Sequence, residues 1–358
     1  MDVIKPNVIW VNGRCYRLYG QRVGSTPFDT GHTGYGDDDQ VYFGRQDDDI
    51  SDDDYEISGA ESGRLKTSFH IPRSLHAVLI GPKGATRMRI EKETKTLIRI
   101  PKKGLDQDIV VSGVTRESVV RARRRMELIA LTARQKQQFT HFLSFPVNDE
   151  NIKSGFLKFQ EQVLTECKGR GIGKDIFQDP NKLHMTLGTL VLFDEPDRKK
   201  AAQALQSCEQ DIVEPLLLNG PLRLRVCGIE YMNDDPAEVD VLYGKVKDLN
   251  EEPVVQHLAD QIVAHFAKTG LMPKQFDSVK LHITLMNSLF RREELDSDSA
   301  KDQNQRKVRE SFDASSILRK FQDYNFGEIV VRSIDLSRRY STASNGYYEA
   351  TATIKLNC

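Results

Sequence analysis

The stretch Lys182-Leu183-His184-Met185-Thr186-Leu187 recurs 98 positions later as Lys280-Leu281-His282-Ile283-Thr284-Leu285, and five of the six residues are identical. Polar and apolar residues alternate in both copies, which is the period of a half-buried β-strand, so residues i and i+2 share a face. The repeat therefore predicts two related strands in a pseudo-symmetric sheet. Each strand is expected to present a lysine, a histidine and a threonine on one face.

Two histidines and two threonines form a set that suits phosphodiester chemistry. If the two strands lie near each other, the imidazoles of His184 and His282 and the hydroxyls of Thr186 and Thr284 converge on one cleft. One neutral imidazole can accept a proton from the attacking hydroxyl or water, while a protonated one donates to the leaving oxygen. Threonine hydroxyls can hydrogen-bond the phosphoryl oxygens. The sequence leaves open which histidine is the base and which the acid.

Other interpretations of the repeat stand beside this one. A single His-x-Thr on an apolar strand is usually a structural histidine, and a matched pair can also be a degenerate, inactive site. Lys182 and Lys280 either add positive potential or are solvated lysines at a strand edge. The five cysteines are scattered and form no Cys-x-x-Cys pair, so they indicate free intracellular thiols. We therefore expect neither a metal nor a cofactor.

A second motif lies in residues 64–136, which hold eighteen Lys and Arg against six Asp and Glu, a net charge of +12. A strand opens this segment and a short helix follows it. The sequence Gly81-Pro82-Lys83-Gly84 then leads into a second helix. The predicted elements are strand 65–71, helix 74–80, helix 85–93, strands 97–100 and 109–111, and helix 115–134, in which Thr115 suits the first position.

This order of elements resembles a type I KH domain with Gly81-Pro82-Lys83-Gly84 as its loop. Two glycines let a backbone approach the sugar-phosphate chain closely. The resemblance implies binding of single-stranded RNA, with single-stranded DNA as the alternative, over about four nucleotides. Lys83, Arg87 and Arg89 lie where phosphates would pass, and Pro82 departs from the pattern by stiffening the loop. A KH-like fold used only for packing is the other interpretation.

The paired His-x-Thr motifs resemble the 2H phosphoesterase superfamily, in particular its A-kinase-anchoring-protein type. Members are bilobal, are built from two α/β repeats, and include RNA ligase-like proteins and 2′-5′ or cyclic phosphodiesterases. The resemblance implies that His184 and His282 are the acid/base pair and that Thr186 and Thr284 bind phosphate. The predicted fold class is thus α+β: a type I KH domain followed by a bilobal, pseudo-duplicated 2H phosphoesterase (RNA ligase-like) α/β domain.

A KH domain followed by a 2H domain is a rare order. Four further segments, 139–143, 230–236, 239–243 and 278–282, strengthen a resemblance to subunits of a nuclear transcription-coactivator complex. It implies a nuclear location, a large helicase subunit and other complex subunits as partners, and a link to alkylation-damage repair. The arginines at 121 and 123–125 suit either nuclear targeting or a solvated helix face. Two functions remain open: an RNA-directed phosphodiesterase, or a non-catalytic RNA-binding adaptor that regulates the helicase.

The total net charge of −1 hides basic and acidic segments whose charges nearly cancel. Residues 1–22 carry +3 and contain a predicted hairpin, 7–19, that turns at Asn12-Gly13. Residues 23–63 carry −11 and are predicted to be a disordered linker. The alternative is that this acidic segment lies transiently on the basic domain and competes with nucleic acid. Residues 137–358 carry −5. Since no apolar stretch approaches the length of a membrane span and none resembles a signal peptide, no membrane partner is expected.

Three further expectations concern residues 137–358. Strands are expected at 139–145, 222–231, 239–246, 327–336 and 347–354, with helices at 155–167, 197–209, 254–269 and 316–321. Gly169–Lys174 has glycines and a lysine but lacks the spacing of a P-loop, so a mobile loop beside the site is predicted. Residues 291–313 are polar and are expected to form a flexible excursion.

Overall fold

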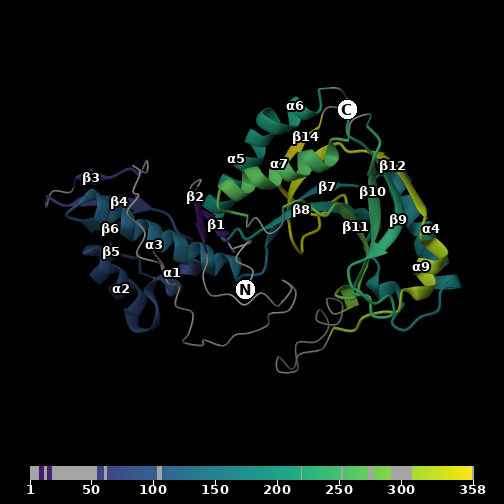
Figure 1. The fold of residues 1–358 in the computed structure, drawn as a ribbon, viewed down its shortest axis with the longest axis horizontal. Coiled ribbons are helices and arrows are strands. Elements are labelled where there is room, and N and C mark those ends of the chain that lie inside the picture. Colours follow the sequence, from purple (N-terminus) through teal and green to yellow (C-terminus); the bar gives the residue numbers. More distant parts are fainter. Residues whose placement is uncertain are drawn as a thin grey trace. The chain divides into compact units, whose positions relative to one another are not determined.

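The computed structural model describes residues 8–11, 14–17, 55–59, 63–102, 107–218, 220–250, 253–272, 277–291 and 309–356 (Figure 1). The boundary between its two compact units falls between Gln138 and Phe139. Near the N-terminus, β1 (Val8–Val11) pairs antiparallel with β2 (Arg14–Arg17), and Val11 lies opposite Arg14. This pairing confirms the predicted hairpin, while its expected turn, residues 12–13, lies outside the described residues. Most of the acidic segment, and hence its predicted disorder, lies outside the described residues.

The basic unit has the predicted order of strands and helices. Its strands form one antiparallel sheet in the order β3-β4-β6-β5. Thr115 caps the long C-terminal helix, because its hydroxyl accepts a hydrogen bond from the Ser118 amide at 3.2 Å. The elements are β3 (Ser58–Gly59), β4 (Leu65–Phe69), α1 (Arg73–Ile80), α2 (Ala85–Thr94), β5 (Thr96–Arg99), β6 (Ile109–Gly113) and α3 (Arg116–Gln135).

This unit begins earlier than the predicted boundary at residue 64. Ser58 and Gly59 pair with β4. The Tyr55 hydroxyl donates to the Glu127 carboxylate at 2.8 Å, and the Arg123 guanidinium lies 4.1 Å from the centre of the Tyr55 ring. The end of the acidic segment therefore belongs to the folded domain. Arg123 also pairs with Glu127 at 2.9 Å, so it packs within the domain, which differs from both expectations for this arginine, a solvated helix face and a targeting signal.

The second unit is built on one sheet of eight antiparallel strands, in the order β12-β9-β10-β11-β8-β7-β13-β14. The strands that carry the two histidine motifs, β8 and β11, lie side by side in the middle. Each is flanked by three strands of its own half. The strands are β7 (His141–Pro146), β8 (His184–Leu190), β9 (Arg223–Tyr231), β10 (Val241–Asp248), β11 (His282–Asn287), β12 (Asn325–Val330), β13 (Ser333–Arg338) and β14 (Ala350–Lys355).

The helices of this unit tie the two halves together, as Figure 1 shows. Helix α4 follows β7 in one half but packs on β12 in the other. Helix α7 follows β10, and its His265 Nε2 lies 3.0 Å from the Ser207 hydroxyl of α5, which packs on β14. The helices are α4 (Glu150–Glu166), α5 (Glu195–Cys208), α6 (Glu214–Leu216), α7 (Val255–Lys268) and α9 (Ser315–Phe321).

Three predicted strands differ from the structure. Residues 327–336 were expected as one strand, but β12 pairs with β9 and β13 pairs with β7, at opposite sides of the sheet. The two hexapeptides are not strands throughout, because β8 and β11 begin at the histidines. Lys182 instead ends a 3₁₀ turn, Pro180–Lys182. The lysines therefore do not share the strand geometry of the histidine and threonine.

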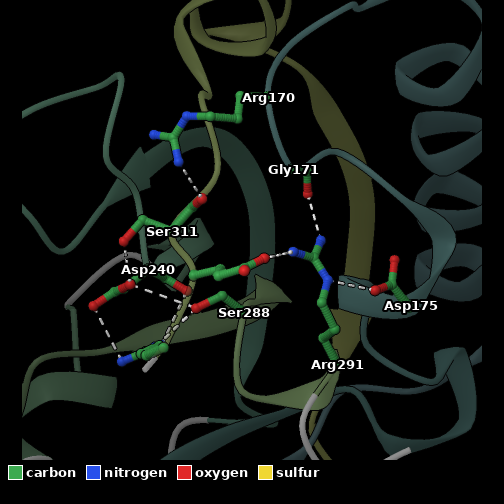
Figure 2. Close-up of polar contacts among 9 residues, drawn as sticks. Arg170, Gly171, Asp175, Asp240, Ser288, Arg291 and Ser311 are labelled. Carbon is green, nitrogen blue, oxygen red and sulfur yellow. Dashed lines mark hydrogen bonds and ion pairs between the residues drawn. The ribbon is translucent and has the colours of Figure 1, made fainter. Parts of the chain in front are cut away.

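The Gly169–Lys174 segment is held by hydrogen bonds, contrary to the predicted mobile loop. The Arg170 side chain donates to the Ser311 carbonyl at 3.2 Å, and the backbone carbonyl of Arg170 accepts from the Asp313 amide at 2.8 Å. The Gly171 carbonyl accepts from Arg291 at 2.7 Å, and Arg291 also pairs with Asp175 at 2.6 Å (Figure 2). The segment is thus a cross-linked part of the fold.

A second arginine fixes the far end of β11. Arg309 pairs with Asp240 at 3.2 Å and donates to the Ser288 hydroxyl and to the Asn287 side chain at 2.8 and 2.9 Å. Asp240 also accepts from Ser311 at 2.8 Å (Figure 2). Residues 309–313 of the predicted excursion are therefore anchored, and residues 292–308 lie outside the described part of the chain.

We expect the stability of this unit to fall in mild acid because of His141 on β7. This side chain is 4% exposed, and burial, with the charges of Arg198 and Arg338, lowers its pKa to about 4. The unfolded chain then binds the proton first, so the stabilisation present above pH 6.5 is lost as the pH falls toward 4. Between pH 7 and 5, His141→Gln should remove roughly 2 kcal/mol of the fall in the free energy of unfolding. Denaturant unfolding of both proteins at each pH measures this difference. A free energy of unfolding that falls equally in the wild type and in His141→Gln would contradict the prediction.

Candidate active site and nucleic-acid interface

The register of the two central strands brings the four predicted residues into one patch. Met185 on β8 pairs with Ile283 on β11 in antiparallel orientation. One residue to either side, His184 therefore lies opposite Thr284, and Thr186 lies opposite His282. All four point to the same face, since Met185 and Ile283 are buried on the other. Directly opposed Cβ atoms lie about 5 Å apart and diagonal ones about 7 Å, so the imidazoles flank a space of phosphate size.

Each imidazole is held by an equivalent hydrogen bond to a backbone carbonyl. Nδ1 of His184 lies 2.7 Å from the Lys182 carbonyl, and Nδ1 of His282 lies 2.7 Å from the Lys280 carbonyl. A carbonyl only accepts, so Nδ1 carries the hydrogen and donates it. In the neutral ring the Nε2 lone pair is then left for substrate. This explains why the lysine positions lie outside the strands: the backbone turns there to present its carbonyl.

The environments of the two histidines differ. The His184 ring packs against Phe142 and Tyr348, with ring centres 5.0 and 5.4 Å away, and burial lowers its pKa to about 4. The His282 ring has one such neighbour, Tyr243, at 5.3 Å. Its pKa is also lowered, mainly by burial and further by the Lys280 charge. Both imidazoles are therefore neutral near pH 7 in the free protein, and either can serve as a base.

Each motif lysine lies over the tyrosine that borders its histidine. The Lys182 ammonium is 5.0 Å from the centre of the Tyr348 ring and donates to the Thr342 hydroxyl at 2.8 Å. The Lys280 ammonium is 4.8 Å from the centre of the Tyr243 ring. These cation–π contacts keep two positive charges at the site. Lys280 is exposed, as the interpretation of solvated lysines predicts, and Lys182 is half-buried.

The sequence did not single out the aromatic residues as part of the site. Phe142, Tyr243 and Tyr348 come from β7, β10 and the turn before β14, and they meet the histidines only through strand pairing. No local spacing predicts that meeting. Within the described part of the chain, no group of three or more His, Cys, Asp or Glu side chains is placed to hold a metal ion. No described helix is long and apolar enough to cross a membrane.

The predicted KH loop has the backbone that its glycines require. Gly81 has φ +69°, and a Cβ there would lie 2.2 Å from the Thr86 hydroxyl. Lys83 and Gly84 both adopt left-handed conformations, with φ 50° and 82°. Pro82 fits as the first residue of the 3₁₀ turn that connects α1 to α2. The proline is thus compatible with the turn.

The side chains around this loop divide into charged and apolar ones. Lys83 and Arg89 are exposed, whereas Arg87 lies 3.8 Å from the Glu91 carboxylate. The sequence did not predict that the neighbouring elements expose large apolar side chains. They are Val78 and Ile80 on α1, Met88 on α2 and Leu97 on β5. Cations beside exposed apolar groups suit a single strand whose phosphates and bases are both contacted.

We expect Gly84→Asp to weaken RNA binding without unfolding the domain. A Cβ at Gly84 would meet only the Met88 methyl at 3.8 Å, and aspartate tolerates left-handed φ better than most residues. The new carboxylate would repel the phosphate, so affinity for a single-stranded oligomer should fall about tenfold. Gly84→Asn is the matched control, with the same shape and no charge. Equal affinities for the two variants, measured by fluorescence anisotropy, would place the RNA elsewhere.

Family comparisons agree with this geometry. Residues 139–356 match the model of the "AKAP7 2'5' RNA ligase-like domain", and residues 66–128 match that of the KH domain. The mouse (Mus musculus) protein "Activating signal cointegrator 1 complex subunit 1" is 38% identical over 357 residues, which cover 97% of this chain and 98% of the mouse protein. The similarity thus includes both units.

Two solved structures are similar to separate parts of the chain. The first KH type I domain of human Vigilin is 25% identical, with a TM-score of 0.21, and covers 25% of this chain and 94% of its own. The protein TT0787 of Thermus thermophilus is 17% identical, with a TM-score of 0.37, and covers 61% of this chain and 97% of its own.

Proposed function

The chain belongs to the AKAP7 2'5' RNA ligase-like domain family, here joined to a KH domain, and on that premise we propose that it binds single-stranded RNA and hydrolyses an RNA phosphodiester without a metal. The observation that carries the proposal is the reciprocal arrangement of His184 and His282. Both rings are fixed through Nδ1 and lie diagonally across one patch with two threonines.

The geometry supports a proton relay. One Nε2 accepts the proton of the attacking water or hydroxyl as the new P–O bond forms. The other imidazole donates a proton to the oxygen that leaves as the old P–O bond breaks. No hydrogen bond joins the Thr186 or Thr284 hydroxyl to another described residue, so both can donate to the phosphoryl oxygens. Lys182 and Lys280 add positive potential where negative charge builds up.

Bound substrate can raise the pKa of the histidine that serves as the general acid. Both imidazoles have lowered pKa values in the free protein, and the general acid must carry a proton. A bound phosphate places negative charge between the rings and raises the pKa of the imidazole nearest to it. The less buried His282 is the easier one to protonate. The second candidate function is a non-catalytic adaptor whose cleft only binds phosphate, and it needs no protonated general acid, which the lowered pKa values disfavour.

We extend the proposal to an assembly. The similarity to the mouse cointegrator subunit over nearly the whole of both chains supports membership of an activating signal cointegrator 1 complex. A nuclear location, a large helicase partner and a role in transcriptional coactivation and DNA-alkylation repair are part of the same proposal. Co-purification of the tagged chain with a helicase from nuclear extract supports it. Recovery of the chain without other subunits argues against it.

A panel of oligonucleotides tests the proposed chemistry. The wild-type chain is incubated in EDTA with substrates that contain a 2′-5′ linkage, a 3′-5′ linkage or a 2′,3′-cyclic phosphate, and products are separated by chromatography. We expect turnover of one class in EDTA. Binding without turnover of any class would favour the adaptor, and turnover that EDTA abolishes would refute the metal-free mechanism.

A further inference from the structure

We propose that Lys245 on β10 forms an anion subsite for the phosphate that flanks the scissile one, so that the site takes an oligonucleotide with at least two phosphates. The inference rests on the proposed function for the position of the scissile phosphate. Lys245 belongs to neither histidine motif.

Strand register places Lys245 beside the histidine pair. Lys245 pairs with His282, and Tyr243 pairs with Thr284. Since alternate residues of a strand share a face, Lys245 emerges on the same face as the two histidines and two threonines. It therefore extends the patch by one strand, on the His282 side.

The neighbouring strand is shaped around the Lys245 side chain. A Cβ on Gly228 of β9 would lie 2.6 Å from Lys245 Cε and 3.3 Å from its Nζ, so the lysine runs over this glycine. Gly228 has φ +79°, and the β9–β10 register shifts next to it. Its amide donates to the Tyr324 carbonyl at 2.8 Å, which fixes the backbone from the other side. The positive φ favours glycine here, and the missing Cβ leaves room for the lysine side chain.

The charge of Lys245 is available to a ligand. The side chain is exposed, and no carboxylate of the described residues lies within 4 Å of its ammonium group. The nearest acidic residue on the paired strand β9 is Glu230, which lies opposite Tyr243, two residues before Lys245. Because Lys245 points over β9, its ammonium lies about two strand spacings, or roughly 10 Å, from β11. That separation is too long for the scissile phosphate and suits the next phosphate of the same strand.

In the other half of the sheet, the position that corresponds to Lys245 holds no cation. The residue that pairs with His184 is Pro146, in the position that Lys245 takes opposite His282. His184 is bordered instead by the Phe142 and Tyr348 rings. The two sides of the patch therefore differ, because two aromatic rings border His184, whereas Tyr243 and Lys245 lie on the His282 side. A nucleotide strand would run with a sugar or base toward His184 and its next phosphate toward Lys245.

The test compares one-phosphate and two-phosphate ligands. The full-length chain is titrated calorimetrically with a dinucleotide and with a trinucleotide, both shorter than the roughly four nucleotides that a KH loop clamps. Lys245→Ala should lower trinucleotide affinity about five- to tenfold, and dinucleotide affinity less than twofold. Lys247→Ala, two residues along the same strand and also exposed, is the matched control and should change neither. Lys245→Arg should retain the affinity.

Each other outcome overturns the subsite. Equal loss for both ligands would place Lys245 on the scissile phosphate, and equal loss in Lys245→Ala and Lys247→Ala would indicate diffuse charge. Gly228→Ala gives a second test, because a methyl group displaces the lysine and should reproduce the Lys245→Ala loss. Failure of the proposed chemistry is distinguishable: a chain that hydrolyses nothing but still shows Lys245-dependent trinucleotide binding retains the subsite and loses the catalysis.

Discussion

His184→Ala and His282→Ala should each lower kcat by about 10²–10⁴-fold, while the affinity for an oligonucleotide changes little. Each variant removes one of the two proton-transfer groups and leaves both threonines, both motif lysines and the KH loop in place. The effect should be on kcat because the imidazoles move protons in the transition state. Both quantities can be measured with one labelled substrate, by single-turnover kinetics and by anisotropy.

His257→Ala is the matched control for these variants. His257 lies on α7 and not on β8 or β11, and its Nε2 lies 2.6 Å from the Gln261 amide nitrogen. We expect wild-type kcat for this variant. If the His184→Ala and His282→Ala variants turn over at the wild-type rate, the imidazoles are structural. If they lose affinity and rate together, they bind phosphate and do not transfer protons.

Gly155→Ala should destabilise the second unit by about 3 kcal/mol, the opposite sign to its usual effect in a helix. An alanine in a helix interior is normally favoured over glycine by about 1 kcal/mol. Here a Cβ would lie 2.0 Å from the Phe326 carbonyl oxygen on β12, and backbone cannot move aside as a flexible side chain can. Helix α4 would have to separate from the half of the sheet that carries His282.

Thermal and denaturant unfolding of the second unit measure this loss. Ser154→Ala is the control, since Ser154 is exposed on the same helix and should be neutral or slightly stabilising. A Gly155→Ala protein as stable as wild type would mean that α4 and β12 are not in backbone contact. Lower activity at temperatures where Gly155→Ala remains folded would show that this contact also positions the two halves.

Much of the fold is predictable from local pattern. The KH element order follows from hydrophobic periodicity, the Gly81–Gly84 spacing and a Thr115 cap, all within about 70 residues. The repeated hexapeptide predicts two equivalent strands, because polar and apolar residues alternate with period two in both copies. It does not show where those strands begin. The turn before each histidine depends on a carbonyl that accepts from Nδ1, and alternation alone carries no signal for it.

The rest of the site depends on pairing between distant strands. Phe142, Tyr243 and Tyr348 contact the histidine rings from distant parts of the chain, and a register is set by long-range packing that one sequence does not display. The division of residues 327–336 into β12 and β13 has the same origin. Val331 and Arg332 alone separate the two strands, although β12 is an edge strand and β13 lies between β7 and β14 at the other side of the sheet.

The double variant His184→Ala/His282→Ala tests the central claim, that two distant copies of one motif form a single catalytic site. Groups that act in one proton relay are non-additive, because removing either already breaks the relay. The double variant should therefore turn over at about the rate of the slower single variant, in EDTA and with the substrate that the wild-type chain prefers. Losses that multiply, so that the double variant is slower by the product of the two single effects, would show that the two histidines act independently and would contradict the account.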